Sequence, residues 1–157
     1  MSTTIKNVFI SHYSKDDPHI QNLKHLLNKK GYQLRNGSID STKPNNANNV
    51  EYIKRMLRGR IQWSNTCIVL IGTKTHTREW VNWEIEQAFK KQTRIVGVYL
   101  SGASGVDVPE NLEKYGSALV GWNSSSIIDT IEGKNIWCNP DNTPRTTGLY
   151  MPTHGIC

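Results

Sequence analysis

The chain has 157 residues, of which 36% are hydrophobic and 20% charged, and its formal net charge is +6. This length argues for one soluble globular domain with a hydrophobic core, and against a small scaffold held together by disulfides. The longest apolar run, residues 67–71, is too short to span a bilayer, and the N-terminus lacks the apolar core of a signal peptide.

Cysteine usage indicates a reducing compartment. The three cysteines, Cys67, Cys138 and Cys157, are widely spaced and form no CxxC pair, and Cys67 lies inside an apolar run as a small core residue would. We therefore expect a cytoplasmic protein that does not contact a membrane. The five histidines show no spacing suited to zinc, so no metal site is expected.

The basic residues are scattered along the chain, but four of them cluster on one short segment. They are Lys54, Arg55, Arg58 and Arg60. No aromatic alternation accompanies them, as a platform for stacking nucleic-acid bases would require. We interpret the segment as a solvated helix face and do not expect nucleic acid as a partner, although the positive charge would favour an anionic small ligand.

The first half of the chain predicts two strands separated by a helix. Residues 6–11 form an apolar run typical of a buried strand, and residues 32–35 form a shorter one. Between them, Pro18 suits a first helical turn and Gly31 a helix end. Residues 36–49 are a polar loop rich in Asn and Ser. The apolar positions of the helix are Ile20, Leu23, Leu26 and Leu27.

The second half predicts a helix from about residue 49, a strand at 66–72 that is apolar on both faces, a helix at 79–91 and a strand at 94–100. A fifth strand at 118–122 and a short helix near residues 127–131 follow. From residue 133 the pattern fails, so we expect a domain over residues 1–132 and an extension over residues 133–157, packed on it or loosely attached. The inward positions of the two middle helices are predicted at Val50, Ile53, Leu57, Ile61, Val81, Ile85, Ala88 and Phe89.

Strands that alternate with helices predict an α/β fold with a central parallel sheet of five strands and helices on both faces. In such sheets ligands bind in the crevice beyond the carboxyl ends of the strands. The candidate substrate-binding residues there are Ser11, His12, Tyr13, Asp40 and Thr73. Ser11 could equally satisfy the end of its strand, Asp40 could cap a turn, and Thr73 could cap the following loop.

A tryptophan and a carboxylate, Trp80 and Glu84, stand four residues apart just after the third strand. On a helix this spacing places one above the other on the same face. An aromatic ring beside an acid suits a nucleobase and a ribose, but the pair could also be a core aromatic and a solvated acid. Of their neighbours, Trp83 is expected to pack, and Glu86 is spaced to pair with Lys90 on the surface.

Several segments together resemble TIR domains. Residues 8–16 (VFISHYSKD) resemble the first TIR sequence box, in which an apolar strand ends in serine before an acidic helix start. Trp80 and Glu84 match the TIR pattern in which a Trp precedes the catalytic Glu by four residues. Residues 69–75 and 78–81 are most similar to the small bacterial TIR-like proteins of the Thoeris anti-phage system. The resemblance covers about residues 6–132, and the order of elements fits the flavodoxin-like TIR fold.

This resemblance implies cleavage of NAD+ between nicotinamide and ribose, with Glu84 as the catalytic residue and Trp80 packed against the base or the ribose. One carboxylate could suffice, because nicotinamide leaves as a neutral molecule and, unlike the leaving oxygen of a glycoside, needs no proton. Enclosure of the cation would favour a cyclic product. NAD+ would be a substrate and not a cofactor.

The resemblance also implies partners. TIR enzymes commonly work as assemblies, so we expect self-association for activity. An ADP-ribose-derived signal would diffuse to a separate effector protein, and an infection cue would be needed upstream.

Two other functions stay open from the sequence. A non-catalytic TIR interaction module would not require Glu84 together with Trp80. The polar loop 36–49 lacks the Gly-x-Pro tip with which many adaptor TIR domains dock their partners, which speaks against this reading. A nucleoside deoxyribosyltransferase-like enzyme would share the α/β layout and also use a glutamate on a nucleoside.

Overall fold

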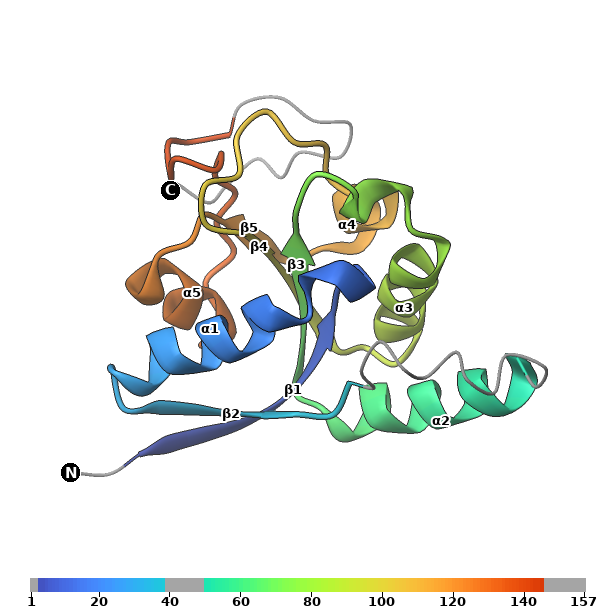
Figure 1. Cartoon of the computed structure of the whole chain (residues 1–157). Coiled ribbons are helices and arrows are strands. Elements are labelled where there is room, and N and C mark those ends of the chain that lie inside the picture. Colours follow the sequence, from blue (N-terminus) through green and yellow to red (C-terminus); the bar gives the residue numbers. More distant parts are fainter. Residues whose placement is uncertain (1–2, 39–49, 146–157) are drawn as a thin grey trace.

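The computed structural model describes residues 3–38 and 50–145 of the chain. Its five parallel strands form one sheet in the order β2-β1-β3-β4-β5, which confirms the predicted flavodoxin-like fold (Figure 1). In this order β1 lies between β2 and β3, so the winding of the chain reverses at β1. The strands are β1 (Thr4–Ser11), β2 (Tyr32–Asn36), β3 (Thr66–Ile71), β4 (Arg94–Tyr99) and β5 (Ala118–Val120).

Helices cover both faces of the sheet, as predicted (Figure 1). One face carries α1 (Pro18–Asn28) and α5 (Ser124–Ile131). The other carries α2 (Val50–Trp63), α3 (Glu79–Lys90) and α4 (Glu110–Tyr115). Two short 3₁₀ turns, η1 (Ser14–Asp16) and η3 (Thr75–Thr77), lead into α1 and α3.

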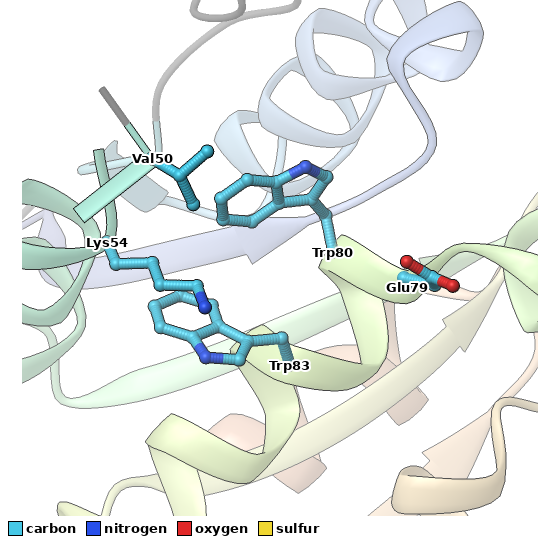
Figure 2. A pocket seen from close by; sticks show the side chains of 5 residues that line it. All are labelled: Val50, Lys54, Glu79, Trp80 and Trp83. Atoms are coloured by element: carbon cyan, nitrogen blue, oxygen red, sulfur yellow. The ribbon is translucent and has the colours of Figure 1, made fainter. Parts of the chain in front are cut away.

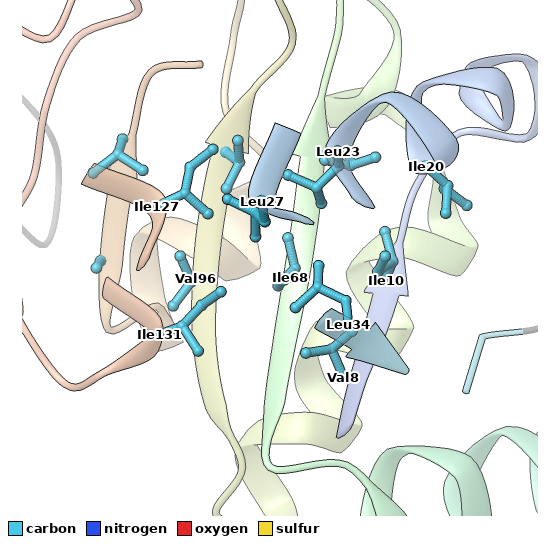
Figure 3. Close-up of a cluster of buried hydrophobic side chains, with 14 of the residues drawn as sticks. Val8, Ile10, Ile20, Leu23, Leu27, Leu34, Ile68, Val96, Ile127 and Ile131 are labelled. Carbon is cyan, nitrogen blue, oxygen red and sulfur yellow. The ribbon is translucent and has the colours of Figure 1, made fainter. Parts of the chain in front are cut away.

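Successive side chains of β3 enter two different cores. Ile68 and Leu70 pack with residues of α1 and α5 (Figure 3), whereas Cys67, Val69 and Ile71 pack with residues of α2, α3 and α4. All five are 0% exposed, which explains why this strand is apolar on both faces. Full burial of one such aliphatic side chain contributes about 1.5–3 kcal/mol, so the middle of the sheet anchors the domain.

The structure differs from the sequence prediction on the α3–α4 side. Phe89 is 51% exposed and does not face inward; its ring stacks on Tyr115 with 4.2 Å between the centroids. The helix that carries Tyr115, α4, was not predicted, because its six residues are too few to show an apolar stripe. No helix in the described part of the chain is long and apolar enough to cross a membrane.

The segment after α5 returns to the edge of the sheet. Leu119 of β5 forms a parallel bridge with Trp137, and the Trp137 side chain is only 3% exposed. Arg145 then forms an ion pair with Glu113 of α4. Periodicity could not indicate this segment, because its contacts are single bridges and not a regular element.

Candidate active site

The carboxylate of Glu84 lies on the side of α3 that faces the sheet. Val81, Ile85 and Ala88 of the same side are buried, and Glu84 is itself only 2% exposed. Ser11, at the carboxyl end of β1, donates a hydrogen bond from its hydroxyl to Oε1 of Glu84 at 2.7 Å. Acidic side chains are almost never fully buried unless they are paired or hydrogen-bonded. The bond therefore ties the acid to the end of β1.

This acid lies at the switch point of the sheet, where β1 and β3 are neighbours. Ser11 pairs in register with Val69 of β3, and the crevice that holds ligands in this fold opens between these two strands. The thiol of Cys67, on β3, has a pKa raised first by burial and second by the negative charge of Glu84. The carboxylate is thus held between α3 and the two central strands.

His12 follows Ser11 and is held by two oxygen atoms. Its Nδ1 lies 3.0 Å from the carbonyl oxygen of Ile10, and its Nε2 contacts Oδ1 of Asp17. An N–H of the ring can donate to either of these oxygen atoms. The His12 side chain is 8% exposed. Its two contacts stabilise the turn that follows β1.

Tyr13 and Arg78 join the loops that follow β1 and β3. The guanidinium carbon of Arg78 lies 3.9 Å from the centre of the Tyr13 ring, a close cation–π contact. In the loop after β3, Thr73 is exposed. Thr75 is fully buried, and its hydroxyl accepts a hydrogen bond from the backbone N–H of Gly72 at 2.9 Å. Thr75 thus closes the turn that follows β3.

The loop after β2 is described only in its first residues. Asn36, which the sequence did not single out, accepts hydrogen bonds at Oδ1 from the backbone N–H groups of Ile10 and Ser38, at 3.1 and 2.9 Å. It therefore fastens the end of β2 to β1. Asp40 lies outside the described residues.

A hollow of about 360 Å³ opens between α2 and α3, lined by Val50, Lys54, Glu79, Trp80 and Trp83 (Figure 2). Trp80 is 36% exposed and meets Trp83 edge-on, with 5.6 Å between the ring centroids. Glu84 does not line this hollow. The sequence predicts Trp80 and Glu84 on one face of the helix. In the structure Trp80 lines the hollow, whereas Glu84 lies on the side of α3 that faces the sheet.

Other sequence expectations concern neighbouring side chains. Glu86 pairs with Lys90 at 3.5 Å on the surface, as predicted. The sequence predicts a solvated helix face for the segment that carries Lys54, yet Lys54 lines the hollow, and no local sequence pattern indicates this. In the described part of the chain, no group of three or more His, Cys, Asp or Glu side chains could hold a metal ion.

The strand order and the buried acid define a flavodoxin-like α/β domain with a carboxylate at its switch point. The family model for the TIR-like domain of Thoeris protein ThsB matches residues 9–104, a span that contains Ser11, Glu84 and the whole hollow. The chain therefore belongs to the ThsB TIR-like domain family.

The individual proteins that match this chain do so over a short segment or at low sequence identity. A Bacillus cereus (strain MSX-D12) protein described as "Putative cyclic ADP-D-ribose synthase ThsB1" is 33% identical over 49 residues, which are 31% of this chain and 26% of that protein. The match thus spans about a quarter of the relative's length. The Clostridium botulinum CMP N-glycosidase BcmB matches 81% of this chain and 99% of its own, with 12% identity and a TM-score of 0.49. That likeness adds nothing to the assignment.

Proposed function

We propose that this protein is a TIR-type enzyme that breaks the bond between nicotinamide and ribose in NAD+, with Glu84 as the catalytic carboxylate. The observation that carries the proposal is the buried Glu84, which is 2% exposed, bonded to Ser11 and held at the switch point of the sheet in a chain of the ThsB family. The description of the B. cereus relative as a "Putative cyclic ADP-D-ribose synthase ThsB1" supports the same chemistry.

The reaction needs one anion and no general acid. The bond between the anomeric carbon and the pyridinium nitrogen breaks, its electron pair goes to nitrogen, and nicotinamide leaves neutral. The ribose carbon becomes an oxocarbenium-like cation, which the Glu84 carboxylate stabilises. Water attack, with loss of a proton to solvent, gives ADP-ribose; attack by another atom of the same nucleotide gives a cyclic product. A fixed anion in a water-poor site stabilises such a cation far better than one in bulk water does.

Burial strengthens the stabilisation that the Glu84 carboxylate gives to the ribose cation. In a medium of low dielectric the attraction between the carboxylate and a positive ribose is strong, and the protein has already fixed the acid during folding. Ser11 holds one carboxylate oxygen at 2.7 Å and sets its direction. We assign Ser11 a positioning role. We propose that the nucleotide lies along α3, with Trp80 packed against its base or ribose.

The proposed product acts as a signal in anti-phage defence. This signal is an ADP-ribose-derived nucleotide, in the first instance a cyclic one, and it diffuses to a separate effector protein. Activity depends on self-association of TIR domains and on an infection cue, because a constantly active consumer of NAD+ would harm its own cell.

The test compares wild-type protein with Glu84→Gln during incubation with NAD+, with products followed by mass spectrometry. We expect nicotinamide release by the wild type and a loss of at least about 100-fold in the variant, the usual size of a removed electrostatic contact in a transition state. Hydrolysis and cyclisation are told apart by mass, since linear ADP-ribose is heavier than the cyclic product by one water molecule.

Glu86→Gln is the matched control, because Glu86 is on the same helix but pairs with Lys90 on the surface. It should keep wild-type activity, and neither variant should melt at a lower temperature than the wild type. Equal NAD+ loss in wild type and Glu84→Gln would overturn the catalytic assignment. No loss in any protein, even at high protein concentration or with lysate of infected cells, would favour an interaction module.

A further inference from the structure

Two cations of α2 share one indole ring of α3. The Nζ atom of Lys54 lies 5.6 Å from the centroid of the Trp83 ring, and the guanidinium carbon of Arg58 lies 5.4 Å from it. Both distances are within the range of a cation–π contact. Lys54 and Arg58 are one helical turn apart, so they present their charges along the same side of α2.

These cations keep most of their hydrogen-bonding capacity. Arg58 uses Nε to donate to Oε1 of Gln87 at 3.3 Å, which leaves the other N–H groups of its guanidinium. Among the described residues, no carboxylate forms an ion pair with either Lys54 or Arg58. Two half-buried cations over an aromatic ring, with no carboxylate of the described residues paired to them, favour an anionic group of a ligand.

The hollow beside them has the shape of a small-molecule subsite. Its volume of about 360 Å³ lies at the lower end of the range of ligand pockets. Trp80 and Trp83 supply its aromatic wall and Val50 its apolar rim, and the ammonium group of Lys54 reaches over the Trp83 ring (Figure 2). Glu79 lies on the other side of Trp80 from Lys54 (Figure 2), so the α2 side of the hollow is the positive one.

We propose that this hollow binds the adenosine-phosphate half of the dinucleotide, with the base against Trp80 and Trp83 and a phosphate on Lys54 and Arg58. This rests on the proposed function. The nicotinamide ring of NAD+ is positively charged, so two cations disfavour it here, whereas adenine is neutral and carries its phosphate beside it. The opposite half of the substrate then extends along α3 toward the anionic Glu84.

Binding can be measured without catalysis, through the quenching of tryptophan fluorescence by ADP-ribose and by AMP. Neither has a nicotinamide bond to cleave. The variant is the double substitution Lys54→Gln with Arg58→Gln, and the control is Arg55→Gln with Arg60→Gln, which removes the same charge from exposed positions of the same helix. Far-UV circular dichroism and melting curves check that both variants fold.

We expect the Kd of both nucleotides to rise at least about tenfold in the Lys54/Arg58 variant and to change less than about twofold in the control. The wild-type Kd should also rise with salt concentration, and more steeply than that of the variant. With NAD+ as substrate, the Lys54/Arg58 variant should show a raised KM and a nearly unchanged kcat.

The outcomes separate this subsite from the catalytic proposal. Equal nucleotide affinity in wild type and the Lys54/Arg58 variant, beside Glu84-dependent cleavage of NAD+, would overturn the subsite and leave the activity standing. Loss of affinity in that variant alone, with no cleavage by the wild type, would support the subsite and overturn the activity. If the control variant lost as much nucleotide affinity, the effect would come from net charge alone, and the subsite would be overturned.

Discussion

At the scale of single residues, the unusual feature is an acid at a position where the helix otherwise carries Val81, Ile85 and Ala88. An aliphatic side chain at residue 84 would add to the core, whereas a carboxylate there must be desolvated. The hydroxyl of Ser11, which is 1% exposed, offsets part of this penalty. A residue that weakens the fold where the ligand crevice opens is a candidate for function on physical grounds.

Removing the hydroxyl tests the link between these two residues. We expect Ser11→Ala to lower NAD+ cleavage by about 10- to 100-fold, because a hydrogen bond to a charged group contributes about 1.5–3 kcal/mol. The control is Ser14→Ala, an exposed serine of the next turn, which should leave the rate unchanged. Rates and melting temperatures are measured together. Full activity in Ser11→Ala would show that Ser11 does not position Glu84.

Asp16 predicts a pH dependence of stability. Burial raises the pKa of this carboxyl above its ordinary value of 3.8, an effect that His19 and His12 partly oppose, and its Oδ2 is buried without a hydrogen-bond partner in the described structure. A raised pKa in the folded state means that ionised Asp16 destabilises the protein at neutral pH. This penalty disappears as the pH falls through the folded-state pKa toward 3.8.

We therefore expect Asp16→Asn to raise the melting temperature at pH 7, by less than about 1 kcal/mol of stability because solvent still screens part of the side chain. The gain should shrink as the pH is lowered toward about 4. Melting curves of both proteins over this range provide the measurement. A difference that stays constant or grows on acidification would contradict the assignment.

At the scale of elements, α3 separates three environments. Its sheet-facing side holds Glu84, its α2-facing side holds Trp80 and Trp83, and its C-terminal end presents Phe89 to Tyr115. The aromatic contact explains why Phe89 can remain 51% exposed. The helix thus links the proposed catalytic acid and the hollow through one rigid backbone.

The contact between β4 and α4 depends on a missing side chain. A Cβ at Gly97 would lie 2.6 Å from Cδ2 of Leu112 and 2.7 Å from Cδ1 of Leu119, both of which are fully buried. We expect Gly97→Ala to destabilise the domain by about 1–3 kcal/mol through overpacking, or about 2–4 °C of melting temperature per kcal/mol.

Gly59 is the matched control. It lies within α2, and a Cβ there would meet nothing within 4 Å. Gly59→Ala should stabilise the protein by about 0.5–1 kcal/mol, because alanine loses less backbone entropy in a helix than glycine does. Urea or thermal unfolding of the two variants measures both effects, and equal stability of the two would refute the packing argument.

At the scale of the whole molecule, hydrophobic periodicity was enough to predict the sheet. Unbroken apolar runs mark the central strands such as β3, which are buried on both faces, whereas the edge strand β2 alternates between buried and exposed residues. It was not enough for α4 or for the bridge between Leu119 and Trp137, since a helix of under two turns and a single bridge have no period.

The candidate site was predictable only in part for a related reason. The positions of Ser11 and Glu84 follow from strand ends and from the resemblance to TIR domains, but their hydrogen bond follows from packing. Lys54 and Arg58 carry no local signal for a ligand. They indicate an anion-binding site only in the folded structure, where α2 lies against α3 and both charges lie over the Trp83 ring.

The hydrogen bond between Ser11 and Glu84 joins residues that are 73 positions apart in the chain. Such a contact cannot form before the chain between its two residues has been made, and closing so long a loop costs conformational entropy. During synthesis, a ribosome that has made β1 has therefore made no catalyst. Under the proposed activity, the growing polypeptide leaves cellular NAD+ untouched until α3 has emerged and packed onto β1, and a chain that stalls before that point does no harm.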